Sequence, residues 1–197
     1  MTSRLESTKR FTVAEYLELE RRSPERHEYF EGEIFAMTGG SRRHTQLAVR
    51  IAGLLDAALH DRPSMVLGSD MRIAVASSSL YTYPDAVVVC GPATFTDERE
   101  ETLLNPSLVV EVLSPSTESY DRGRKFEHYR TIASLVDYIL VSQDAPLVEH
   151  FVRQPSGSWL LTDYRAGRSL VVESIGVSIS VDEIYRKDLD STGDASA

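Results

Sequence analysis

Two apolar segments, joined by a segment of helix length, constrain the fold of this chain more than any other feature. Residues 107–113, SLVVEVL, and residues 136–142, VDYILVS, are apolar runs of strand length. Between them, residues 118–133 carry a stripe of apolar side chains at helical spacing, namely Phe126, Tyr129 and Ile132. Two strands connected through a helix lie parallel in one sheet. The sequence therefore predicts a βαβ-like unit in this region.

Two further helices are expected in the N-terminal half. Thr12 precedes apolar residues at helical spacing in residues 11–20, so it is the expected N-cap of a short helix. A Gly-Gly break and Ser41 precede a longer helix within residues 39–61. The apolar face expected for this longer helix consists of Leu47, Ile51, Leu54, Leu55 and Ala58.

The other segments show the alternation and turn residues of strands. Residues 27–37 predict a strand or a hairpin that turns at Gly32, and residues 64–76 predict one bent strand or two short ones. A strand within residues 81–90 is entered through Pro84 and leads into a polar, acidic loop. The C-terminal part predicts an antiparallel meander of three strands, at residues 146–153, 158–165 and 169–174. A last segment, residues 178–185, closes the domain.

The whole chain has 197 residues, a length that suits one domain with a sizeable core. The element order predicts an α/β or α+β fold with a mixed β-sheet core flanked by helices and with C-terminal antiparallel strands. We expect one domain over residues 1–186. Residues 187–197 are small and polar, so we expect a disordered tail there.

Three features point to the cytoplasm. No apolar run approaches the roughly 20 residues of a membrane span, so no membrane contact is expected. The N-terminus lacks the apolar stretch of a signal peptide. The single cysteine, Cys90, excludes an intrachain disulfide, and its position at the end of an apolar strand favours a reduced, buried thiol.

Charge is unevenly distributed along the chain. The formal net charge of −9 argues against a strongly basic nucleic-acid-binding protein. Residues 41–44 and 121–130 are nevertheless locally basic, whereas residues 96–101 are acidic. A basic face on an acidic protein is therefore possible.

Two carboxylates interrupt apolar strands. Glu111 lies within the run of residues 107–113, and Asp85 directly precedes a run of valines. An unpaired buried charge costs several kcal/mol, so each carboxylate must be neutralised, hydrogen-bonded or bound to a cation. Two carboxylates from neighbouring strands can converge on one hard divalent cation, which typically keeps several water ligands. This pattern suits metal-assisted phosphodiester hydrolysis. Structural roles, as a strand-start residue or a cross-strand ion pair, are the alternative.

The motifs YPDAVVVC, LVVEVLSPSTESYDRGRKFEHYR and DYILVS resemble the Uma-two family of predicted endonucleases. That family belongs to the PD-(D/E)XK restriction-endonuclease-like superfamily, and the resemblance covers roughly residues 11–186. It implies a restriction-endonuclease-like fold whose order of elements agrees with the one derived above. It also implies that Asp85 and Glu111 hold the metal ion.

One position departs from the superfamily pattern. A lysine is expected two residues after the glutamate, but Leu113 stands there. Resemblance to members with a migrated lysine implies that Lys125, on the following helix, takes its place and orients the attacking water. Arg122, Lys125 and Tyr129 are expected on one face of that helix. A solvated surface lysine is the alternative.

Further site residues are implied or suggested. By resemblance, an N-terminal acidic residue completes the metal site, with Glu33 as the candidate and Glu31 as its alternative. His44, near a helix start, could contact phosphate or carry a proton. A plain surface histidine is the alternative. The motif residues Ser114, Ser116 and Thr117 suit a turn and the start of a helix.

Three functions are compared. The leading hypothesis is a Mg²⁺-dependent (or Mn²⁺-dependent) nuclease that cuts DNA. The second is a non-catalytic module that binds nucleic acid or a partner. The third is a structural dimer in which strand carboxylates pair with arginines such as Arg72. A homodimer is expected in which residues 147–174 pair between copies, because long apolar strands with exposed edges are usually covered.

Overall fold

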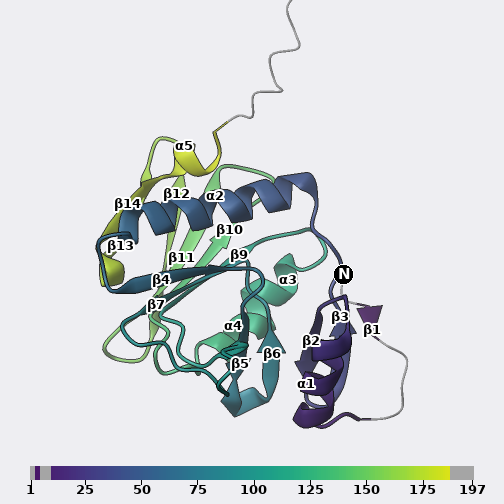
Figure 1. Ribbon diagram of the computed structural model, residues 1–197. Coiled ribbons are helices and arrows are strands. Elements are labelled where there is room, and N and C mark those ends of the chain that lie inside the picture. The colour runs from purple at the N-terminus through teal and green to yellow at the C-terminus, as the bar shows by residue number, and fades with distance from the viewer. Residues whose placement is uncertain (1–2, 5–9, 187–197) are drawn as a thin grey trace, which may run out of the picture.

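Two six-stranded sheets and a two-stranded sheet form the fold of the computed structural model, which describes residues 3–4 and 10–186 (Figure 1). The first sheet has the order β1 (Ser3–Arg4), β3 (Glu33–Ala36), β2 (His27–Phe30), β6 (Leu80–Thr82), β5 (Arg72–Val75), β8 (Thr102–Leu103). The second has the order β12 (Trp159–Arg165), β11 (Leu147–Arg153), β10 (Asp137–Val141), β9 (Leu108–Val112), β7 (Ala86–Cys90), β4 (Ser64–Gly68). The third consists of β13 (Ser169–Val172) and β14 (Val177–Ser180). The expected tail, residues 187–197, lies outside the described residues.

The helices are α1 (Val13–Arg22), α2 (Arg42–Leu59), α3 (Glu118–Tyr120), α4 (Phe126–Tyr129) and α5 (Val181–Ile184). A π-helical turn, η2 (Asp121–Lys125), joins α3 to α4, and two 3₁₀ turns are η1 (Ala76–Ser78) and η3 (Glu173–Ile175). Both predicted N-caps are confirmed. Thr12 forms a capping box with Glu15, and the Ser41 side chain accepts a hydrogen bond from the His44 amide.

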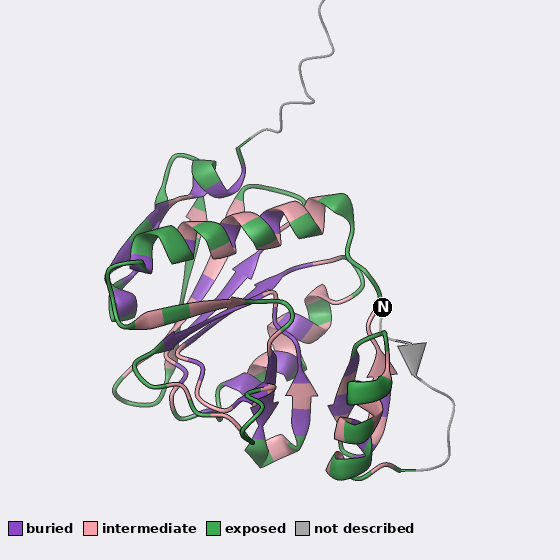
Figure 2. Cartoon of the chain, viewed as in Figure 1, coloured by how far each residue is buried: buried purple, intermediate pink, exposed green. Residues whose placement is uncertain are grey.

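The predicted βαβ-like unit is confirmed, because β9 and β10 pair in parallel. Side chains alternate across β9, so one face packs on α2 and the other on α4. The α4 face also packs against apolar residues of the first sheet, which covers that side of the core. Figure 2 shows the buried strands between these layers and the exposed outer face of α2. The mixed α/β class expected from the sequence is therefore confirmed.

Residues 64–76 form two short strands, which is one of the two predicted alternatives, and these strands lie in different sheets. Four other local expectations are corrected. Tyr81 and Thr82 belong to β6 rather than to β7. Ala58 is exposed, and Leu59 completes the buried face of α2. Cys90 is exposed, because β7 ends there and the chain turns away at Gly91.

The C-terminal meander is the fourth correction. Strands β11 and β12 pair antiparallel as expected, but β13 pairs with β14 instead of continuing from β12. The β13–β14 pair buries its apolar side chains against α2, which pulls it out of the second sheet. Strand β12 consequently forms an edge of that sheet.

Candidate active site

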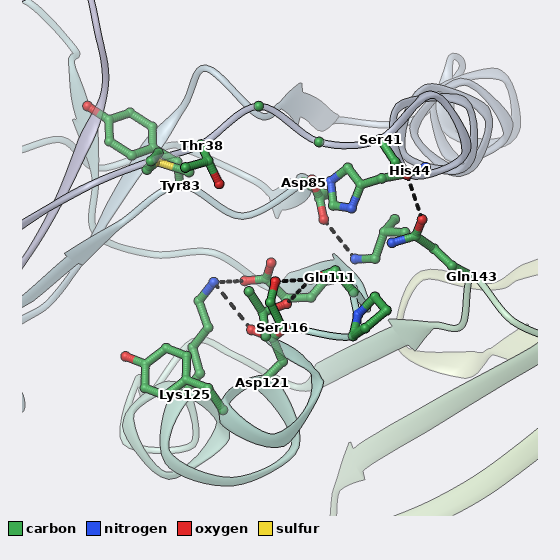
Figure 3. A pocket seen from close by; sticks show the side chains of 18 of the residues that line it. Thr38, Ser41, His44, Tyr83, Asp85, Glu111, Ser116, Asp121, Lys125 and Gln143 are labelled. Carbon is green, nitrogen blue, oxygen red and sulfur yellow. Dashed lines mark hydrogen bonds and ion pairs between the residues drawn. The ribbon is translucent and has the colours of Figure 1, made fainter. Parts of the chain in front are cut away.

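A polar pocket of about 280 Å³ lies where the start of α2, the adjoining ends of β7 and β9, and the turn η2 meet. Its acidic and basic lining residues are Glu28, His44, Asp85, Glu111, Asp121 and Lys125. Figure 3 shows these elements approaching the pocket from different sides, with Lys125 directed at Glu111 and Asp121. Segments far apart in the sequence therefore supply one cluster of ionisable groups.

Asp85 lies where the chain crosses from the first sheet to the second, between β6 and β7. The pairing of Ala86 with Val110 is the last of the β7–β9 ladder, which places Asp85 across from Glu111. The β7–β9 ladder ends there, so the Val112 amide donates its hydrogen bond to the Asp85 carboxylate, at 2.7 Å, instead of to a backbone carbonyl of β7. Its other oxygen lies 2.8 Å from His44 Nε2. Asp85 is thus held in a fixed orientation from two sides.

Glu111 lies in the middle of β9 and is only 5% exposed. Its side chain faces α4, and its Oε1 accepts hydrogen bonds from the Tyr129 hydroxyl at 2.7 Å and from Lys125 Nζ at 2.8 Å. Burial raises the pKa of Glu111 to about 8, although the charge of Lys125 opposes this rise. Glu111 therefore sits in an apolar strand as a paired, hydrogen-bonded group and not as an isolated charge.

Lys125 reaches the pocket from η2, and its side chain is 8% exposed. Besides Glu111, its ammonium lies 3.6 Å from Glu28 and 3.7 Å from Asp121. Burial would lower the pKa of Lys125, but the surrounding carboxylates raise it well above its usual value. Lys125 is therefore a buried, positively charged group, and the surface-lysine alternative is contradicted.

The π turn changes which residues share the helix face. Single π turns within α-helices widen the helix locally and occur frequently at functional sites. Here the turn aligns Asp121 with Lys125 and Tyr129. Arg122 points elsewhere and pairs with Glu118 and Glu149, so the expected face with Arg122 is wrong. The expected helix also ends at Tyr129 rather than near residue 133.

Two acidic pocket residues were missed by the sequence analysis. Asp121 is 3% exposed, and burial raises its pKa against the opposing effect of Lys125. Glu28 projects from β2 and also accepts a hydrogen bond from Thr82. The spacing of Asp121 four residues before Lys125 was a usable signal, whereas nothing local distinguished Glu28 from other strand glutamates.

The structure does not bring Glu33 or Glu31 to the pocket. Glu33 faces the same side of the β2–β3 hairpin as Glu28, because it pairs with Phe30. It nevertheless lies at the turn end of the hairpin and is not among the pocket-lining residues. Glu31 occupies the turn itself, with a positive φ of 48°. Of the hairpin acids, the pocket contains Glu28.

His44 lies in the first turn of α2 with its ring against Asp85 (Figure 3). The hydrogen bond with Asp85 raises the pKa of His44, while partial burial opposes the rise. Gly40 makes room for the ring, since a Cβ at that position would lie 2.6 Å from His44 Cδ2. His44 is therefore a positioned member of the cluster and not a plain surface histidine.

The SPST motif forms the turn that precedes α3. The carbonyl of Ser114 accepts hydrogen bonds from the amides of Thr117 and Glu118, and its hydroxyl lies 3.1 Å from that of Ser116. The three motif residues line the pocket, as does Gln143, whose amide group donates to the Leu113 carbonyl and whose oxygen accepts from Ser41. Turn formation and the start of a helix are thus confirmed for this motif.

The carboxylate oxygens of the pocket are the type of ligand that a hard divalent cation prefers. Within residues 10–186, no three His, Cys, Asp or Glu side chains are arranged as a ready metal-binding group. Mg²⁺ is commonly held by only one or two carboxylates, with waters and phosphate oxygens completing its shell. Four carboxylates line the pocket with one lysine and one histidine, so the cluster favours an added positive charge. Asp85 and Glu111 stand across from each other on neighbouring strands and both line the pocket, so the residue types present there suit a two-carboxylate site.

The fold is shared with a solved structure. The crystal structure of a protein described as "a putative nuclease belonging to DUF820" from Anabaena variabilis ATCC 29413 matches with a TM-score of 0.72 and 18% sequence identity. The match covers 89% of this chain and 97% of that chain. This chain therefore shares the fold of that DUF820 protein.

The chain belongs to the Uma2 family, whose description is "Putative restriction endonuclease" and whose model matches residues 13–182. Two relatives from Synechocystis sp. are the uncharacterized proteins slr1290 and sll1609. The first is 42% identical over 87% of this chain and 90% of its own length. The second is 40% identical over 80% of this chain and 89% of its own length. The family resemblance noted in the motifs is thus confirmed.

None of the helices in the described part of the chain is both long enough and apolar enough to cross a bilayer.

Proposed function

We propose that this protein is a divalent-metal-dependent nuclease that hydrolyses DNA phosphodiester bonds in the pocket at Asp85 and Glu111. The observation that carries the proposal is one pocket in which Asp85 and Glu111 stand across from each other on neighbouring strands while Lys125 Nζ lies 2.8 Å from Glu111. Membership of the Uma2 family supports it, since the description of that family is "Putative restriction endonuclease". We further propose Mg²⁺ or Mn²⁺ as the cofactor and the cytoplasm as the location.

Each pocket residue has a distinct part in the proposed reaction. Asp85 and Glu111 would hold the cation, which, when bound, polarises the phosphoryl group and favours hydroxide formation. Lys125 is anchored by carboxylates and carries a permanent positive charge, so it orients the attacking water and offsets charge that develops in the transition state. His44 lies on the other side of Asp85 and can carry a proton near neutral pH.

The contacts of Arg72 and Glu111 disfavour the hypothesis of a structural dimer. Arg72 does not pair with either strand carboxylate but donates to Thr102 and Tyr83. Glu111 is paired within the chain, by Lys125. A non-catalytic binding module with this fold is the second candidate function, and the absence of the strand lysine at Leu113 favours it.

A metal-binding experiment tests the proposal. The wild-type chain should gain thermal stability with Mn²⁺ or Mg²⁺, and Asp85→Asn should abolish the gain. Asparagine is preferred to alanine, because its side-chain oxygen still accepts the Val112 amide, whereas alanine would leave that buried amide unpaired at a cost of about 1–3 kcal/mol. Asp56→Asn, an exposed position on α2, is the matched control.

Cleavage is measured with the same variants. Mg²⁺-dependent cutting of duplex DNA should be lost in Asp85→Asn and Glu111→Gln and retained in Asp56→Asn. Metal-dependent stabilisation without cleavage of any DNA substrate would favour the binding module. An unchanged melting temperature with either cation would contradict the metal site.

A further inference from the structure

A second charged surface adjoins the pocket at the start of α2. It is a groove lined by Gly40, Arg42, Thr45, Gln46, Val49, Arg50 and Arg186. Three of these residues are arginines and none is acidic, although the chain as a whole carries a formal charge of −9. Gly40 lines both this groove and the pocket, so the two surfaces are continuous.

The arginines of the groove are brought together by tertiary contacts. Arg50 donates hydrogen bonds to the carbonyls of Ile184 and Arg186 at 3.1 and 2.8 Å. Tyr185 donates to the carbonyls of Ser142 and Leu147, which ties the end of α5 to the second sheet. Figure 1 shows α5 above α2. Arg186 is therefore held beside α2, although it lies 136 residues after Arg50 in the sequence.

The residues at the rim of the groove leave it open. Arg42, Thr45 and Arg186 are exposed, and Val49 is 69% exposed. From Arg42 to Arg50 the helix advances about 12 Å, at about 1.5 Å per residue. One strand of DNA presents a phosphate about every 3.4 Å along the duplex axis, so roughly three phosphates match this length. An elongated polyanion suits the groove better than a single small anion.

We propose that this groove binds the phosphate backbone of the DNA strand that enters the pocket, with Arg42 and Arg186 as the contacting residues. The inference rests on the proposed nuclease function and adds the path of the substrate. Continuity at Gly40 favours nucleic acid over an acidic protein partner, because a backbone on the groove passes directly to Asp85 and His44. Arginine is well suited to phosphate because its guanidinium donates in a planar fork.

The double variant Arg42→Ala/Arg186→Ala tests the groove. Binding of a fluorescently labelled DNA duplex to the full chain is followed by anisotropy in EDTA over a range of salt concentrations. The dissociation constant should rise roughly tenfold, and the slope of log affinity against log salt should become shallower by about two, one for each lost phosphate contact. Arg124→Ala/Arg130→Ala is the matched control, since it removes the same two charges from exposed arginines that line neither the groove nor the pocket.

The outcomes separate this inference from the nuclease proposal. If Asp85-dependent cleavage occurs but the double variant keeps the wild-type KM and salt slope, the groove is not the DNA path. If the double variant weakens binding selectively while the wild type cuts no DNA, the groove stands and the nuclease function fails. Equal weakening by Arg124→Ala/Arg130→Ala would overturn the groove, because only net charge would matter. Binding of an acidic protein with no affinity for DNA would overturn it as well.

Discussion

Lys125 Nζ lies 2.8 Å from Glu111 Oε1, with both side chains less than one-tenth exposed. The lysine comes from a π turn and the glutamate from the middle of a strand, 14 residues earlier in the chain. A buried charge pair of this kind survives only with good geometry and further hydrogen bonds, which Tyr129 supplies. The pair connects the crossover helix to the carboxylate pocket.

Lys125→Met should abolish cleavage and retain metal binding. The substitution removes the charge that orients the attacking water but leaves the carboxylates of Asp85 and Glu111 in place. We expect a loss of cleavage rate of about a hundredfold or more, measured with a DNA substrate, alongside an unchanged thermal shift with Mn²⁺. Arg124→Met, one residue away and exposed, is the control and should cut at nearly the wild-type rate. A wild-type rate for Lys125→Met, with Asp85→Asn inactive, would show that the lysine is not needed.

His44 should titrate above the usual histidine range in the metal-free protein. Its hydrogen bond with Asp85 favours the charged imidazolium, so the stability it contributes is fully present below pH about 6.5 and is lost as the pH rises through its higher folded pKa. Asp85→Asn should lower the pKa of His44, because the charge of the partner is lost while partial burial remains. Titration by NMR in EDTA measures both values. A pKa of His44 that Asp85→Asn leaves unchanged would contradict the pairing.

Gly40→Ala should displace the His44 ring from Asp85. A Cβ at Gly40 would lie 2.6 Å from His44 Cδ2, closer than real Cβ contacts, so the ring must move. The expected signs are a lower pKa of His44 and slower cleavage, with little loss of stability because the ring is the movable partner. Gly39→Ala is a close control, since no atom lies within 4 Å of a Cβ there. Equal behaviour of the two variants would argue against a role for the glycine.

A homodimer should form through the exposed edge of β12. Leu160 and Leu161 on this edge strand are 55% and 46% exposed, and unpaired strand edges tend to pair with another chain. Leu161→Lys should convert the dimer to a monomer in sedimentation experiments at micromolar concentration. Met65→Lys is the matched control on β4, the opposite edge of the same sheet, where Met65 is also 46% exposed. A monomeric wild-type chain would count against the dimer.

Much of the fold followed from local patterns. The crossover between residues 107–113 and 136–142 follows from two apolar runs and a helical stripe, since few other connections bury both runs. The caps at Thr12 and Ser41 depend on side chains within three residues of the helix start. Such features rest on contacts near in sequence, and the sequence alone was sufficient to place them.

The candidate site was only partly visible in the sequence. Glu111 and Asp85 stood out because a carboxylate in an apolar strand needs a compensating partner. Asp121 replaced Arg122 on the helix face because the π turn shifted the helical phase, which side-chain periodicity assumes to be constant. The pairing of β13 with β14 likewise depends on packing against α2 and not on the strand pattern.

The sequence by itself determined the class of fold and singled out the two strand carboxylates, because each is marked by residue type against its local pattern, whereas Lys125 was implied only by the family resemblance. Only the tertiary structure decided that Glu28 rather than Glu33 lines the pocket and that Arg186 lies beside α2. The physical reason is distance along the chain. These groups meet through sheet pairing and helix packing between segments up to 136 residues apart, and no local pattern encodes such contacts.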